Sequence, residues 1–253
     1  MQSIYLFDPT CFPYRIHVYS YFISEFKKYG YEFKIFYDPE KTTIDKEGFE
    51  PLTYAFSSFL RLHLKRKPSV SIFFIWLRYK FSLPFLIFTR LFLPTKSIVW
   101  SKGINIANIN QPIKNTLYYI RQFAADALIL YSDFEKQFIK TSKKKVFIAN
   151  NTINQYAYKL DNSSPEDLRN KYNINYKKVV LFVGRVQQRK RVDLLLEIFE
   201  KDIKDHALLI IGPEMPYNYK QTIDQNENIY YLGPVYDLKK LSEIYTLSSI
   251  FCI

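Results

Sequence analysis

Residues 181–199, LFVGRVQQRKRVDLLLEIF, combine residue types that could bind a phosphate. An apolar run ends at Gly184, and an amphipathic helical pattern begins at Val192. Four basic residues lie between them: Arg185, Arg189, Lys190 and Arg191. Such cations repel one another and are unfavourable at a helix N-terminus, where the helix dipole favours anions. A phosphate bound in this turn would remove both costs, so the stretch predicts a phosphate-binding turn between a strand and a helix.

The alternative interpretation is a basic turn that only faces solvent, as runs of charged residues commonly do. Under the phosphate hypothesis the four cations are not equivalent. We expect Arg189 and Arg191 to face solvent, while Arg185 and Lys190 contact the ligand.

The elements that position this turn follow from the alternation of apolar runs and helical patterns along the chain. The sequence predicts strands at 3–8, 32–38, 72–77, 97–101, 127–132, 145–150, 178–183, 207–212, 228–235 and 249–253. It predicts helices within 15–31, 112–125, 192–203 and 237–247, with Gly30 ending the first of them. Residues 40–71 have no clear pattern. Strands that alternate with helices in this way indicate open, parallel α/β sheets.

We expect two α/β domains, residues 1–157 and 177–253, joined by a polar linker at 158–176. One short helix is expected in this linker, with Ser164 as its N-cap and Pro165 at its first position. The second domain has few βα units and ends on the apolar strand 249–253. We therefore expect the chain to be a truncated form of a longer protein.

Composition limits the classes of partner and site. The 253 residues carry a net charge of +12 and 18% aromatic residues, so anionic partners are expected. Only two cysteines are present, Cys11 and Cys252, which argues against a disulfide framework or a cysteine metal site. Arg78, Lys80, Arg90 and Lys96 interrupt the most apolar stretch, residues 69–100, so no membrane span is expected. A reducing cytoplasmic location is the prediction.

Residues 61–92 interleave Lys and Arg with Phe, Trp and Tyr, and two interpretations stay open. The stretch could bind an anionic membrane surface, or it could be a buried helix and strand whose charged ends reach solvent. Two other classes are disfavoured. A dinucleotide-binding enzyme would need Gly-x-Gly-x-x-Gly after the first strand, where FDPTCFPYR stands. A nucleic-acid-binding protein is not expected, because the basic residues look dispersed and no recognition motif is present.

Several segments, in order, resemble one enzyme family. They are FISEFKKYGYEFKIFY (22–37), VWSKGIN (99–105), AADALILYSDFEKQFI (124–139), VFIANNTIN (146–154), VVLFVGRVQQRKRVDLLLEIF (179–199), ALLIIGPE (207–214) and NIYYLGPVYDLKKLSEIYTLSSIF (228–251). The chain resembles the GT-B-fold retaining glycosyltransferases of family 4, the glycosyl transferases group 1. The resemblance implies two Rossmann-like domains facing a cleft, the C-terminal one incomplete. It also implies transfer of a sugar from a nucleoside-diphosphate sugar to a surface-polysaccharide or lipid-linked glycan acceptor.

The resemblance also assigns site residues. Donor binding is expected from Gly184, Arg185, Lys190, Gly212 and Val235. Arg185 and Lys190 would neutralise the charge of the departing nucleoside diphosphate, with no metal and no cofactor required. Acceptor-side candidates are Lys102, Gly103 and Asn105. The expected partners are the nucleotide-sugar, the glycan or lipid-linked acceptor and an anionic membrane surface at the cytoplasmic side, and not nucleic acid.

Four departures from the family pattern bear on activity. Lys102 stands where the pattern has His, and FPYRIHVY (12–19) replaces a Gly-rich loop. The GPEM segment (212–215) lacks the second Gly of Gly-x-Gly. The Glu-x7-Glu element, which would contact the donor sugar and ribose, is absent. The chain as given is therefore expected to bind nucleotide weakly and to be inactive, as a fragment or a nucleotide-binding remnant.

Overall fold

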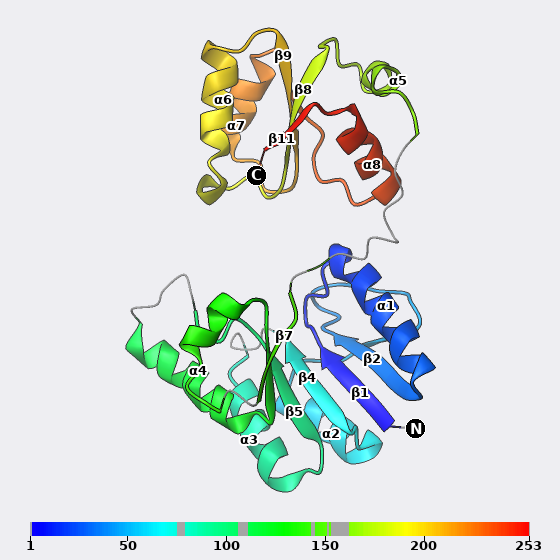
Figure 1. The fold of residues 1–253 in the computed structure, drawn as a ribbon, viewed down its shortest axis with the longest axis vertical. Helices are drawn as coiled ribbons and strands as arrows, with labels where there is room; N and C mark the ends of the chain where they lie inside the picture. Colours follow the sequence, from blue (N-terminus) through cyan, green and yellow to red (C-terminus); the bar gives the residue numbers. More distant parts are fainter. Residues whose placement is uncertain are drawn as a thin grey trace. The chain divides into compact units, whose positions relative to one another are not determined.

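The computed structural model describes residues 2–74, 79–105, 111–142, 145–150, 152 and 162–252. The chain divides into two compact units, Met1–Asn154 and Gln155–Ile253. Each unit is an α/β layer structure with a parallel sheet, as the sequence predicted (Figure 1).

The first unit contains a seven-stranded sheet in the order β3-β2-β1-β4-β5-β6-β7, and every pair of neighbours is parallel. Its strands are β1 (Gln2–Phe7), β2 (Tyr31–Tyr37), β3 (Phe49–Pro51), β4 (Val70–Phe74), β5 (Lys96–Trp100), β6 (Ala127–Leu130) and β7 (Val146–Ile148). Its helices are α1 (Pro13–Lys28), α2 (Phe56–Arg66), α3 (Ser82–Phe92), α4 (Pro112–Ala124) and the 3-10 helix η2 (Asp133–Phe138). Residues 75–77 of the strand predicted at 72–77 lie outside the described residues.

Helices cover both faces of this sheet, which is why β1 is apolar at successive positions. Ile4 and Leu6 pack with Tyr19 of α1 on one face. Tyr5 and Phe7 point to the opposite face, and the core there includes buried side chains of α2, α3 and α4. Figure 1 shows α1 on one side of the sheet and α3 and α4 on the other.

The second unit contains a four-stranded parallel sheet in the order β10-β9-β8-β11. Its strands are β8 (Lys178–Val183), β9 (His206–Ile211), β10 (Ile229–Tyr231) and β11 (Ile250–Cys252). Its helices are α5 (Pro165–Lys171), the 3-10 helix η5 (Gln188–Lys190), α6 (Val192–Lys201), α7 (Tyr217–Asp224) and α8 (Leu238–Leu247). The core beneath α6 and α7 includes Val180 and Phe182, and the core beneath α5 and α8 includes Val179 and Leu181.

The helix predicted after Ser164 is confirmed as α5. The Ser164 hydroxyl accepts the Asp167 N–H at 3.1 Å, and Pro165 opens the helix. Residues 165–176, which we expected within a linker, pack as part of the second unit. The Lys171 ammonium and the Tyr172 hydroxyl both donate to the Glu243 carboxylate, at 2.6 and 2.8 Å, which fixes α5 against α8.

Candidate functional site

The turn after β8 lies at the carboxyl end of a parallel sheet, where open α/β sheets bind ligands. The Gly184 N–H donates to the Ile211 carbonyl at 2.8 Å, and the Val186 N–H donates to the Pro213 carbonyl at 3.0 Å. The Val186 side chain is buried in the core beneath α6 and α7. The backbone is therefore anchored on both sides of Arg185, whose side chain is exposed.

The segment after β9 packs against this turn so closely that only glycine fits at position 212. A Cβ on Gly212 would lie 1.7 Å from the Gly184 carbonyl oxygen. The Tyr231 hydroxyl donates to the Gly212 carbonyl at 2.7 Å, and the Gly212 N–H donates to the Gly233 carbonyl at 3.1 Å. Gly212, predicted as a donor-binding residue, thus also determines the spacing of the loops around the turn.

Glu214 occupies the position where the family pattern has its second glycine. Its φ is +72°, a left-handed conformation that is unfavourable for a residue with a Cβ. Its carboxylate lies 3.7 Å from the Arg185 guanidinium and accepts a hydrogen bond from the Gln187 amide. An acidic side chain therefore stands beside the predicted phosphate-binding arginine.

The four cations of the turn differ in their neighbours. Arg185 pairs with Glu214, Arg189 Nε donates to the Gln187 amide oxygen at 2.9 Å, and Arg191 pairs with Asp193 at 3.3 Å. Lys190 is exposed and has no ion pair within the described part of the chain. Arg189 and Arg191 are exposed, in line with the expectation that they face solvent.

The remaining predicted donor residue, Val235, lies between β10 and α8. Its side chain is half-buried and packs against the core beneath α5 and α8. Its contact with the donor stays a prediction.

The acceptor-side candidates lie in the turn after β5. Lys102 is exposed, Gly103 is buried with φ +78°, and Asn105 is half-buried. The Gly103 carbonyl accepts the Gln122 amide at 3.1 Å, and a Cβ at Gly103 would lie 3.0 Å from Ile139 Cδ1. Gly103 is therefore a structural residue of the turn, and none of the three lines the pocket described next.

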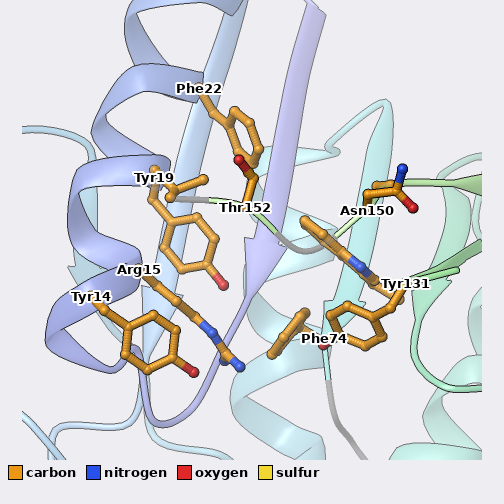
Figure 2. Close-up of a pocket in the computed structure, with 11 residues that line it drawn as sticks. Tyr14, Arg15, Tyr19, Phe22, Phe74, Tyr131, Asn150 and Thr152 are labelled. Atoms are coloured by element: carbon orange, nitrogen blue, oxygen red, sulfur yellow. The ribbon is translucent and has the colours of Figure 1, made fainter. Parts of the chain in front are cut away.

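A pocket of about 120 Å³ lies at the carboxyl ends of the central strands of the first unit (Figure 2). Its aromatic walls consist of Tyr14, Tyr19, Phe22, Phe74, Trp100 and Tyr131. Arg15, Asn150 and Thr152 add polar groups. We call it the aromatic pocket. The sequence did not reveal it, because its residues come from α1, from the ends of β4 and β5, and from the segments after β6 and β7.

Buried Asp8 holds two side chains of the pocket wall, Arg15 and Tyr19, in place by hydrogen bonds. It is 1% exposed, and its carboxylate accepts the Arg15 guanidinium at 2.9 Å and the Tyr19 hydroxyl at 2.8 Å. The same carboxylate accepts the backbone N–H groups of Thr10 and Cys11 at 3.2 and 3.1 Å. These bonds order the loop between β1 and α1, which leads into FPYRIHVY (12–19), the segment that replaces the Gly-rich loop of the family pattern.

The charge on Arg15 is held in a mostly apolar setting. Burial opposes that charge, but the Asp8 carboxylate together with Tyr19 and Tyr14 outweighs burial, so the pKa of Arg15 is raised. The guanidinium carbon lies 4.1 Å from the Phe74 ring centroid, a cation–π contact that Figure 2 shows. Burial and then the Asp8 carboxylate raise the pKa of the Cys11 thiol, so this cysteine stays protonated and unreactive.

Within the described ranges, no group of three or more His, Cys, Asp or Glu side chains is placed to hold a metal ion. In the same ranges, none of the helices combines the length and apolar character that crossing a bilayer requires.

The architecture of this chain is shared with known proteins. Residues 177–253, which contain the turn after β8, match the family model "Glycosyl transferases group 1". Sucrose-phosphate synthase from Thermosynechococcus elongatus has a similar structure, with a TM-score of 0.74 at 16% identity over 99% of this chain and 75% of that chain. The chain has the GT-B fold of glycosyltransferases.

Two other GT-B structures resemble this chain at similarly low identity. Anabaena HepE, solved with UDP and glucose, has a TM-score of 0.70 at 12% identity over 99% of this chain and 73% of that chain. UDP-GlcNAc 2-epimerase from Neisseria meningitidis, bound to UDP-GlcNAc, has a TM-score of 0.64 at 12% identity over 99% of this chain and 76% of that chain. No curated protein matches the chain. These likenesses show the GT-B fold, and the family match adds a glycosyltransferase signature over residues 177–253.

Proposed function

We propose that this GT-B chain belongs to a glycosyltransferase that transfers a sugar from a nucleoside-diphosphate sugar to a surface-polysaccharide or lipid-linked glycan acceptor, with retention at the transferred carbon. The observation that carries the proposal is the turn after β8. It presents Arg185 and Lys190 at the carboxyl end of a parallel strand, inside the residues that match group 1 glycosyl transferases.

The chemistry assigned to this turn is stabilisation of the leaving group. Bond cleavage at the donor sugar leaves negative charge on the nucleoside diphosphate, and a cation already in place lowers the energy of that step. The side chain of Arg185 is exposed, and hydrogen bonds of Gly184 and Val186 fix the backbone on both sides of it. Lys190 lies in the 3-10 helix η5 and is also exposed. Transfer without a metal is part of the proposal.

We assign the acceptor to the first unit. Sugar rings present C–H groups on their faces, which pack on aromatic rings, while their hydroxyls need hydrogen-bonding partners at the edge. The aromatic pocket offers both, since Tyr14 and Tyr131 supply ring surface and Asn150 and Thr152 supply polar groups (Figure 2). Lys102 and Asn105, in the turn after β5, remain candidates for a second contact with the acceptor.

Two alternatives are distinguishable. An epimerase shares the fold and would also bind the nucleotide-sugar, but the family match of residues 177–253 favours transfer. A nucleotide-binding protein without transferase activity would keep the diphosphate contacts and lack turnover. Donor binding and donor cleavage are therefore measured separately.

The test compares three single variants, R185A, K190A and R189A, in calorimetric titrations with UDP and GDP. We expect R185A and K190A to lose about tenfold or more in nucleotide affinity, because each removes a charge-assisted hydrogen bond. Where turnover is measurable, each should cost about 2–4 kcal/mol of transition-state stabilisation. R189A is the matched control and should change little, since Arg189 bonds to Gln187 and faces solvent. Equal losses in all three would indicate a diffuse basic surface and contradict the proposed site.

A further inference from the structure

The positive charge of the chain is concentrated, not dispersed as the sequence analysis expected. Between Glu50 and Asp126 there is no acidic residue. The same stretch contains eleven basic residues: Arg61, Lys65, Arg66, Lys67, Arg78, Lys80, Arg90, Lys96, Lys102, Lys114 and Arg121. One continuous stretch therefore accounts for nearly all of the net charge of +12.

The helices of this stretch, α2, α3 and α4, form a single layer of the first unit. Phe59 of α2, Phe85 of α3 and Ala124 of α4 all belong to the same buried core. The three helices therefore cover one face of the seven-stranded sheet, opposite α1 (Figure 1). We call the outward sides of α2, α3 and α4 the basic face.

The basic face also exposes large apolar side chains at helical spacing. On α4 these are Ile113 (82% exposed), Leu117 (41%), Ile120 (40%) and Phe123 (55%). Positions separated by three or four residues share one side of a helix, so these four form one apolar stripe turned away from the core. The neighbouring helix α3 adds Ile87, Leu91 and Phe92, and α2 adds Leu64.

Cations accompany these apolar side chains. Arg61 and Lys65 are exposed on α2, one helical turn apart and beside Leu64. Arg90 and Lys96 are 41% and 71% exposed at the end of α3 and the start of β5, near Asp126 at 4.0 and 3.7 Å. Exposed cations thus occur on α2, at the end of α3 and at the start of β5, in the same layer as the apolar stripe of α4, whose Arg121 is buried.

We propose that the basic face docks on an anionic lipid surface. Interfacial helices insert apolar side chains at the boundary of the bilayer while Lys and Arg bind anionic headgroups. With 13 residues, α4 is shorter than the roughly 20 residues that a membrane-spanning helix needs, so it would lie along the surface. A nucleic acid would use the cations but would gain nothing from a stripe of Ile, Leu and Phe. This inference does not depend on the proposed glycosyl transfer.

The test is co-sedimentation of the full chain with vesicles of phosphatidylcholine alone and with vesicles that also contain phosphatidylglycerol. We expect binding to the anionic vesicles only, weakened by added salt because the electrostatic part is screened. The α4 variant I113Q/L117Q/I120Q should lower the binding constant about tenfold or more. The α2 variant R61Q/K65Q should weaken binding to the anionic vesicles several-fold.

The matched control is L194Q/I198Q, which removes two exposed apolar side chains from one side of α6 in the second unit. It should bind vesicles like the unmodified chain. All variants should keep their thermal unfolding midpoints, because every substituted side chain is exposed. Absence of binding to the anionic vesicles, or equal losses in the α4 variant and the control, would overturn the proposal. So would tight binding to duplex DNA that R61Q/K65Q weakens and the α4 variant leaves unchanged.

Discussion

The carbonyl oxygen of Gly184 occupies the space that a side chain on residue 212 would need, 1.7 Å from where its Cβ would lie. The two glycines end neighbouring parallel strands, β8 and β9, and their contact brings the Arg185 turn and the Glu214 loop together. The geometry of the candidate donor site therefore depends on a backbone contact that no side chain can replace.

The first prediction is that Gly212→Ala destabilises the second unit by about 3 kcal/mol, because the backbone of one loop must move. Gly184→Ala is the control, since its Cβ would have Phe182 as its nearest neighbour at an ordinary 3.4 Å. Urea unfolding followed by circular dichroism measures both. Similar losses for the two variants would show that the contact is not specific to Gly212.

The second prediction concerns Glu214. Replacing it by Gly should raise the unfolding free energy by about 1 kcal/mol relative to Glu214→Ala, because only Gly adopts φ +72° without strain. Both variants also remove a carboxylate 3.7 Å from Arg185, so both should bind UDP more tightly. The pair is about half exposed on each side, so the gain should be about fivefold or less. Unchanged UDP affinity in both variants would mean that Glu214 does not compete with phosphate.

The third prediction is a pH dependence that comes from His63. Its Nδ1–H donates to the Phe59 carbonyl and its Nε2 accepts the Ser71 hydroxyl, each at 2.8 Å, because a carbonyl can only accept. Burial lowers the pKa of His63 to about 4, from 6.5 in the unfolded chain. Between pH 6.5 and 4, His63 therefore binds a proton in the unfolded state but stays neutral in the folded state. This contribution leaves stability intact above pH 6.5 and removes about 3 kcal/mol as the pH falls to 4.

Urea unfolding at several pH values between 6.5 and 4 measures this effect. In the variant His63→Gln, the unfolding free energy should fall less steeply as the pH is lowered. His17→Gln, the control, should keep the original slope, since His17 lies on α1 away from this core. A slope that is the same in the unmodified chain and in His63→Gln would contradict the assignment.

The fourth prediction tests the aromatic pocket. Tyr14→Ala should abolish saturation-transfer NMR signals from a panel of methyl hexosides and leave UDP affinity unchanged, because Tyr14 and the Arg185 turn belong to different units. Tyr14 is 49% exposed, so the folded state should tolerate its removal. Tyr21→Ala is the control on the same helix, 42% exposed and not part of the pocket wall. Equal loss of signal in both variants would argue against a carbohydrate site there.

Elements with a strong pattern were predictable from the sequence. Strand β8 was predicted with its observed ends because both of its faces are buried, so its apolar run is uninterrupted. The start of α6 at Val192 was predicted because Val192, Leu196 and Phe199 form one buried stripe. The Ser164 cap followed from short-range side-chain chemistry, which needs no tertiary context.

The helices that the sequence did not predict show no clear helical repeat of apolar residues. Helix α3 is apolar on both its buried and exposed sides, and α2 buries a histidine on its inner side. In neither helix does the sequence separate an apolar buried side from a polar exposed side. Helix α7 follows Pro216 and is polar over most of its length. The aromatic pocket could not be predicted either, because separate segments contribute its walls and only the sheet order brings them together.

The pairing of β8 imposes an order on biosynthesis. Strand β8 lies between β9 and β11, and the Ser249 N–H donates to the Val179 carbonyl across 70 residues of sequence. While the ribosome is still making α8, one edge of β8 therefore has no neighbour, although its apolar residues have already emerged. The centre of the first unit has a similar delay, because the second edge of β1 pairs with β4, with Ile4 opposite Val70. Unpaired strand edges can pair with other chains, so each of the two sheets is open to mispairing on the ribosome until its later strand has emerged.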